Sequence, residues 1–324
     1  MEYLLITLAA LCIGVQFNIN KIYGKVSPKG IAGAFLFPCL TTIVGAFILL
    51  CINLFSLKFT AFGVIMAAIG SVISVLSLSI GILATGRGRV SVYTTFMMLG
   101  GMFLPYVYGL CTGEKPTVGK IIGMIVLIAA LVLSVLPSKE ERMNKTPIKL
   151  SFIVLCAVAF ILNGCTSIVS NIHQKNTQMQ MATFDYVITG YLMQFVLAAV
   201  TVGVIVLIKT LIKHFRKNSE NTIRMQENAT LNPEKQVFSF GAFAKKALII
   251  FAICTLFSVV SGGGFLLQLV ANKTLDASLL YPFVTGGSTV FGTLIAAIMF
   301  KEKLNVTTIT SLVLMLGGTV LFIF

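Results

Sequence analysis

Long uninterrupted apolar stretches constrain this chain more than any other feature of its sequence. Residues 118–136 read VGKIIGMIVLIAALVLSVL, and residues 306–324 read VTTITSLVLMLGGTVLFIF. A helix that crosses a bilayer needs about 20 mostly apolar residues, whereas the strands of a membrane barrel alternate between apolar and polar residues. The stretches therefore predict membrane-spanning helices.

Composition indicates the same class of protein. Of the 324 residues, 57% are hydrophobic and 10% are charged, whereas roughly a quarter of the residues in a soluble domain are charged. We predict an all-α polytopic membrane protein. Its ten predicted spans have the approximate limits 3–20, 31–57, 60–83, 90–112, 118–136, 148–172, 182–210, 244–270, 277–300 and 305–324.

Two polar breaks organise the ten spans. Residues 138–147, within PSKEERMNKTP, predict a connecting loop between a first unit of five spans (1–137) and a second unit of five spans (148–324). A polar linker at about 213–243 is expected between the second and third spans of the second unit, because its composition suits a solvated segment.

The two units contain related sequences. Aligning Glu114 of GEKPTVGKIIG with Glu302 of KEKLNVTTITS gives an offset of 188 residues, which also pairs Tyr93 with Tyr281. Because each unit has an odd number of spans, the two units are expected to enter the membrane in opposite orientations. Such an inverted repeat is typical of secondary transporters. The repeated acid is expected to mark the turn between the fourth and fifth helices of each unit.

Two segments carry a resemblance to a known family. GEKPTVGKIIGMIVLIAALVL (113–133) and KEKLNVTTITSLVLMLGGTVL (301–321) resemble the repeat motif of the drug/metabolite transporter superfamily, in its ten-helix EamA-like family. In that motif a small residue stands about nine positions after the acid. Gly123 takes this place in the first copy, and Gly317 lies in the second copy. The resemblance implies two inverted five-helix repeats and the transport of metabolites, sugars, nucleotide-like compounds or drugs.

The chain also departs from the family pattern. It contains no tryptophan, and Lys301 stands where the family usually has glycine. These departures leave the substrate open. By contrast, the lysine often seen in the family's first helix has a counterpart here, Lys21.

Lysine and arginine are unevenly divided between the two sides of the predicted bundle. Of the 24 basic residues, we assign 19 to odd-numbered connections and five to even-numbered ones. For a protein of the plasma membrane, the positive-inside rule then places the odd-numbered connections in the cytoplasm and both termini on the opposite side. The net charge of +14 fits the membrane surface, so no nucleic-acid partner is expected.

Polar side chains inside the spans are candidates for a substrate pathway. A buried amide, phenol or ammonium group must meet water or a partner. A central cavity would satisfy these groups together, and hydrogen bonding between helices is the alternative. Lys21 could instead extend to the membrane interface. The candidates are Gln16, Asn20, Lys21, Tyr93, Asn163, Gln268, Asn272 and Tyr281.

Acids and histidines are rare in the predicted spans. Asp185 is the candidate for a proton-coupling carboxylate, and an acid at the positive start of a helix is the alternative reading. His173 is expected to be a solvated loop histidine, with a proton relay as the alternative.

The predicted function is secondary active transport of a small neutral or zwitterionic metabolite by alternating access. An exporter of drugs or lipid-like compounds is one alternative, and a non-transporting receptor or scaffold is another. The sequence lacks GxSxG, HExxH and phosphate-loop motifs, so no enzyme, cofactor or metal site is predicted. Protons are the candidate coupling ion, and monomer and homodimer both stay open.

Overall fold

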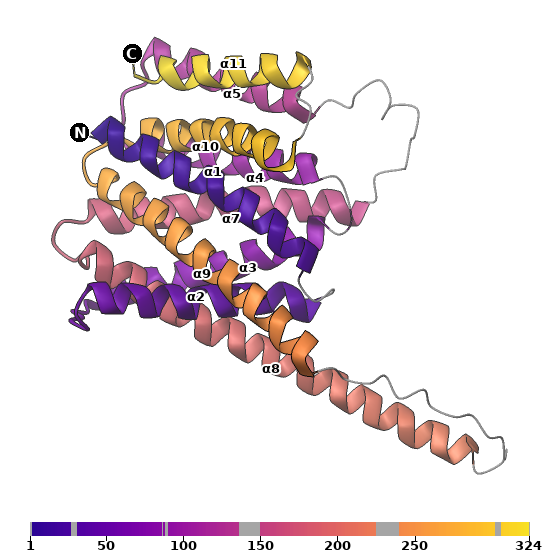
Figure 1. Cartoon of the computed structure of the whole chain (residues 1–324). Coiled ribbons are helices and arrows are strands. Elements are labelled where there is room, and N and C mark those ends of the chain that lie inside the picture. The colour runs from indigo at the N-terminus through magenta and orange to yellow at the C-terminus, as the bar shows by residue number, and fades with distance from the viewer. Residues whose placement is uncertain are drawn as a thin grey trace.

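A computed structural model gives the fold, which Figure 1 shows. It describes residues 2–26, 31–85, 87, 90–135, 150–224, 240–301 and 306–323. Within these ranges the secondary structure consists of ten helices without any strand, as predicted. They are α1 (Glu2–Val26), α2 (Ile31–Ile52), α3 (Ala61–Thr85), α4 (Val90–Cys111), α5 (Val118–Val135), α7 (Leu150–Lys175), α8 (Thr183–Arg224), α9 (Phe240–Ala271), α10 (Ala277–Phe300) and α11 (Val306–Leu321).

The helices have the lengths and surfaces of membrane spans. Seven of those described are long and apolar enough to cross a bilayer, and α4, α5 and α11 contain shorter apolar helices. Large apolar side chains such as Phe47, Ile125 and Ile298 lie exposed on the outside of the bundle. Lipid can cover such a surface at no cost, and a helix satisfies its own backbone hydrogen bonds in lipid. The chain is therefore a polytopic helical membrane protein.

Helices that are far apart in sequence pack side by side. α1 packs against α9 and α10, and α7 packs against α3 and α4. α2 packs against α8, and α5 pairs with α11 at one end of the bundle (Figure 1). The most extensive helix contacts therefore join residues 2–135 to residues 150–323.

Both ends of the chain lie on the same side of the bundle (Figure 1). The connections after α2, α4, α7 and α9 lie on that side too, and the free end of α8 projects from the opposite side.

Two helices are longer than the sequence indicated. α8 has 42 residues and reaches Arg224, so at 1.5 Å per residue it is about 63 Å long, roughly twice the thickness of the hydrocarbon core. The predicted polar linker at about 213–243 is thus helical at its start, and α9 begins at Phe240. The predicted loop at 138–147 and Glu302 lie outside the described residues.

Candidate functional site

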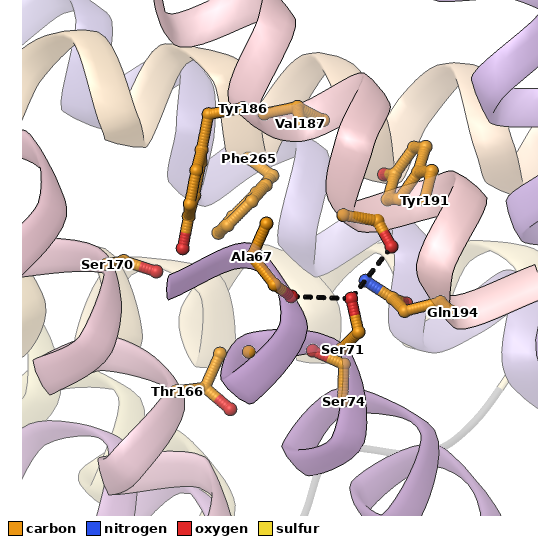
Figure 2. A pocket seen from close by; sticks show the side chains of 12 residues that line it. Ala67, Ser71, Ser74, Thr166, Ser170, Tyr186, Val187, Tyr191, Gln194 and Phe265 are labelled. Carbon is orange, nitrogen blue, oxygen red and sulfur yellow. Dashed lines mark hydrogen bonds between the residues drawn. The ribbon is translucent and has the colours of Figure 1, made fainter. Parts of the chain in front are cut away.

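A small cavity lies where α3, α7, α8 and α9 meet (Figure 2). About 40 Å³ in it is open to the centres of water molecules, and one water needs roughly 10–15 Å³ on that measure. The cavity therefore has room for a few waters in this conformation. Its lining residues are Ala67, Gly70, Ser71, Ser74, Thr166, Ser170, Tyr186, Val187, Gly190, Tyr191, Gln194 and Phe265.

The lining combines hydroxyl groups with aromatic rings. Five of its side chains carry a serine, threonine or tyrosine hydroxyl on α3, α7 and the start of α8, Tyr191 carries a sixth, and Gln194 adds an amide. Phe265 of α9 contributes an apolar ring beside Tyr186 (Figure 2). No lining residue is charged. A ligand would find hydrogen-bond donors and acceptors here, without a counter-ion.

Ser71 fixes one wall of the cavity. Its hydroxyl lies 2.6 Å from the carbonyl oxygen of Ala67 in its own helix and 2.9 Å from that of Gly190 in α8 (Figure 2). A serine that contacts the carbonyl four residues earlier is a common arrangement in membrane helices. Here the same hydroxyl also ties α3 to α8.

Tyr186 and His173 form a buried ring stack behind the cavity. The two ring centres are 3.8 Å apart and the planes are 15° from parallel. The Tyr186 hydroxyl lies on the side of Ser170 (Figure 2), and Phe62 lies against the histidine as well. His173 is fully buried, so the expectation of a solvated loop histidine is wrong: α7 continues to Lys175 and the ring packs between two aromatic side chains.

The hydrogen bonds of His173 define its neutral form. Its Nε2 accepts the backbone N–H of Met181 at 3.1 Å, so that nitrogen carries no proton. The proton of the neutral ring is then on Nδ1, which only the Gln174 amide oxygen can accept. The amide atom placed 3.1 Å from Nδ1 is the nitrogen, and exchanging the two amide atoms pairs Nδ1 with the amide oxygen that otherwise lacks a partner. The histidine thus fastens the end of α7 to the segment that leads into α8.

Asp185 lies next to the cavity without lining it. Its carboxylate accepts the Asn53 side-chain amide at 2.9 Å and the backbone N–H of Lys58 at 3.2 Å. It is buried in the first turn of α8. The contacts hold the α2–α3 connection against the start of α8, and the proton-coupling role stays a prediction.

Two of the predicted pathway residues come together in a separate polar network. Asn272 accepts the amide of Asn171 at 2.7 Å and donates to the Tyr281 hydroxyl at 2.9 Å. Tyr281 in turn donates to the carbonyl oxygen of Ser167 at 2.6 Å. Asn171, Asn272 and Tyr281 are buried. The network links α7, the end of α9 and α10, as interhelical hydrogen bonding would.

The remaining candidates lie apart from the cavity. Asn163 donates to the Met97 carbonyl at 2.8 Å and so joins α7 to α4. The ammonium nitrogen of Lys21 is 4.3 Å from the centre of the Phe300 ring at the exposed end of α1. Tyr93 is buried in a cluster between α3, α4 and α7. Half-buried positions are taken by Gln16, Asn20 and Gln268.

Sequence reasoning missed Asn18, the buried amide of α1. Its amide nitrogen lies 3.0 Å from the carbonyl oxygens of both Gly14 and Gly292. The spacing of Gln16 and Asn20 suggested a polar helix face, but Asn18 is the residue that meets the neighbouring helix. Only the position of Gly292 in α10 identifies this contact, and no local pattern predicts it.

Glu114 contacts the start of a helix in the other half of the chain. Its two carboxylate oxygens each accept a backbone N–H at 2.9 Å, from Ala277 and Ser278 of α10. Lys120 lies beside them, 2.9 Å from the Ser278 hydroxyl and 3.3 Å from the Asp276 carboxylate. An acid is favoured here because the first N–H groups of a helix lack partners and carry partial positive charge.

The small residues of the predicted repeat motif lie in the α5–α11 pair. A Cβ at Gly123 would lie 2.9 Å from the carbonyl oxygen of Gly318, and one at Gly318 would lie 2.9 Å from Leu127. A Cβ at Gly317 would meet open space. Gly318 is therefore the residue of the pair that allows the close approach.

Comparisons with known proteins identify a fold that crystallography has already observed. No family model and no curated protein sequence matches the chain. Among solved structures, 28 chains match. One of them, described as "Crystal structure of protein", has a TM-score of 0.65 and 13% sequence identity, and the match covers 98% of this chain and 95% of that one. At 13% identity the likeness shows a shared fold and nothing about function.

Proposed function

We propose that the chain is a secondary active transporter, similar to the EamA-like drug/metabolite transporters, and that all ten of its helices cross the plasma membrane. It would move a small organic metabolite by alternating access between two inverted five-helix halves, α1–α5 and α7–α11. The observation that carries this proposal is that residue contacts made by one half recur, with the roles of the halves exchanged. We call two residues exchange partners when they occupy corresponding positions in the two halves. The offset is 150 residues from α1 to α7, 149 from α2 to α8, 187 from α3 to α9, and 188 from α4 and α5 to α10 and α11.

The glycine contacts of α1 and α7 recur in this way. A Cβ at Gly14 would lie 3.0 Å from the carbonyl oxygen of Ser288 in α10. A Cβ at Gly164, the exchange partner of Gly14, would lie 2.7 Å from the carbonyl oxygen of Gly100 in α4. Gly100 and Ser288 are separated by 188 residues, the offset that aligns Glu114 with Glu302.

The serine bridges recur in the same way. Ser71 of α3 donates to its own helix and to Gly190 of α8. Its exchange partner Ser258 of α9 lies 2.7 Å from the carbonyl oxygen of Cys254 and 2.7 Å from that of Thr41 in α2. Thr41 and Gly190 are 149 residues apart, so each serine joins its helix to the corresponding helix of the other half.

The pair of α5 and α11 contacts itself symmetrically. Gly123 of α5 lies against the carbonyl oxygen of Gly318 in α11. Its exchange partner Ser311 donates to the carbonyl oxygen of Ala130 at 2.7 Å, and Ala130 is the exchange partner of Gly318. Packing of unrelated helices would not be expected to repeat these contacts between exchange partners.

The contacts support a two-fold relation between the halves, with five helices in each. An odd number of crossings inverts one half relative to the other, and rocking of inverted repeats about a site between them is the usual mechanism of such carriers. The cavity lies between α3 of the first half and three helices of the second, where that mechanism needs a site. An exporter of drugs or lipid-like compounds would use the same fold.

Solute counterflow in proteoliposomes tests the proposal. Vesicles loaded with an unlabelled solute are diluted into a trace of the same labelled solute, with alanine, xylitol, ribose and choline as the panel. A carrier that alternates accumulates label transiently above equilibrium, and protein-free vesicles do not. A folded, reconstituted protein that gives no overshoot with any of the four would contradict transport of a small metabolite and favour an exporter of drugs or lipid-like compounds, or a receptor or scaffold.

A further inference from the structure

We propose that the cavity between α3, α7, α8 and α9, which holds a few waters in this conformation and must widen to admit a solute, is the substrate site and that it takes a small uncharged solute rich in hydroxyl groups, of the polyol or sugar class. This inference rests on the proposed transport function and narrows its substrate. It has three supports: the chemistry of the lining, the reason that the cavity is open, and the residues that occupy the equivalent place in the other half.

The lining matches an uncharged polar solute. Ser71, Ser74, Thr166 and Ser170 present hydroxyl oxygens that can accept hydrogen bonds. Ser71 and Thr166 already donate to backbone carbonyls, so donation to a solute falls to Ser74 and Ser170. The aromatic faces of Tyr186 and Phe265 form an apolar side (Figure 2). A carboxylate or ammonium group would lose its hydration here without gaining an ionic partner, and burial of an unpaired charge is costly. A polyol offers hydroxyls to one wall and C–H groups to the other.

The cavity is open because of a glycine. A Cβ at Gly70 would lie 3.6 Å from the Tyr186 hydroxyl oxygen. The exchange partner of Gly70 is Phe257, and that of Tyr186 is Phe37. In the other half these two phenylalanine rings pack together, with centres 4.7 Å apart. A phenylalanine therefore fills the place in one half that a glycine leaves empty in the other.

The ring pair behind the cavity supports the correspondence of the two places. His173 stacks on Tyr186 at 3.8 Å. Their exchange partners Tyr23 and Phe37 also lie in contact, with ring centres 4.3 Å apart and planes tilted by 43°. The surroundings thus correspond, while Gly70 in one half is replaced by Phe257 in the other.

The counterpart place keeps the polar character of the lining. Thr166 and Ser170 line the cavity on α7, and their exchange partners on α1 are Gln16 and Asn20. Both of these half-buried amides were predicted as pathway residues. A solute that passes from one conformation to the other would meet uncharged donors and acceptors in each, so the same class of solute suits both.

A single tryptophan reports on the site directly, because the chain contains none. In Phe265→Trp, all tryptophan emission comes from the cavity wall. We expect a saturable shift of the emission to shorter wavelength as xylitol displaces water, and no saturable change with alanine or choline. The matched control is Leu78→Trp, the exchange partner, which packs in the cluster around Phe37 and Phe257. It should not respond in the conformation seen here.

A second variant works without fluorescence. Gly70→Ala adds one methyl group at ordinary contact distance, so the protein should fold, but the cavity becomes smaller. The xylitol concentration for half-maximal counterflow should rise about tenfold or more, because extra volume in a closely packed site is costly. Gly203→Ala, where a Cβ would meet open space, should leave it unchanged.

The outcomes separate this inference from the transport proposal. Counterflow of xylitol with a silent Phe265→Trp and an unaffected Gly70→Ala would place the site elsewhere and leave transport standing. Saturable responses to alanine or choline in place of xylitol would overturn the substrate class. If Phe265→Trp does not fold, the comparison of Gly70→Ala with Gly203→Ala still decides the question. The absence of counterflow with every solute would remove both proposals.

Discussion

The close contact between α4 and α7 gives the sharpest test of the packing. A Cβ at Gly100 would lie 1.9 Å from the carbonyl oxygen of Phe160 and 2.5 Å from its carbon. Real Cβ atoms essentially never approach another heavy atom below 3.0 Å. In Gly100→Ala the two helices must therefore separate by about 1 Å, because the obstructing atoms are backbone and cannot rotate away.

The magnitude follows from two opposing terms. Forcing extra volume into a packed interface costs about 1–3 kcal/mol, and a backbone clash belongs at the upper end. Alanine recovers up to about 1 kcal/mol of helix propensity over glycine. We expect Gly100→Ala to lose about 2 kcal/mol of stability, which corresponds to a fall of roughly 4 °C in melting temperature.

The assay is thermal unfolding of detergent-purified protein, followed by size-exclusion chromatography of the fraction that stays soluble. Gly203→Ala is the matched control, since its Cβ would meet open space on α8. That variant should melt at or slightly above the parent temperature. If Gly100→Ala melts as high as Gly203→Ala, then α4 and α7 are not in backbone contact and the account of the fold is wrong.

Three further substitutions test the polar contacts by the same assay. Glu114→Gln leaves one acceptor for two N–H groups and removes the charge at the start of α10, so we expect a loss of about 1–3 kcal/mol in the free energy of unfolding. The exposed control Lys115→Gln should change stability little. Equal melting temperatures of the two variants would refute the contact between Glu114 and the start of α10. Tyr281→Phe leaves a buried amide without its acceptor and should cost about 1–3 kcal/mol, in contrast to the exposed Tyr3→Phe, and no loss would mean that the network is not formed. His173→Phe keeps the ring stack but strands the backbone N–H that Nε2 accepts, with a similar expected cost; a stabilised variant would contradict that bond.

The sequence predicted the architecture well for a physical reason. Apolar length is a local property, so each of the ten predicted spans overlaps a helix of the structure. The offset of 188 between Glu114 and Glu302 also located the start of α5 and α11, at Val118 and Val306. Sequence could not show that Glu114 reaches α10, because that contact depends on how the two halves pack.

The candidate site was harder to predict. The cavity is lined by serine and threonine hydroxyls, which are common in membrane helices, and its opening depends on Gly70, which no sequence motif marks. Polarity instead directed attention to Asn272 and Tyr281, which satisfy each other. Burial of His173 depends on the aromatic rings that α3 and α8 place around it. Each of these is a tertiary contact without a local signal.

The direct test of two alternating halves is a pair of distances measured by double electron–electron resonance. One pair of spin labels, at Thr112 and Lys273, reports the distance between two turns, one in each half, on the side where the termini lie. The other pair, at Arg87 and Lys301, lies on the opposite side, and all four positions are exposed. The labels are placed in a cysteine-free background that retains counterflow. When a solute that gives counterflow is added, alternating access predicts that one distance increases while the other decreases. Distances that both stay fixed, or that change in the same sense, would contradict the account.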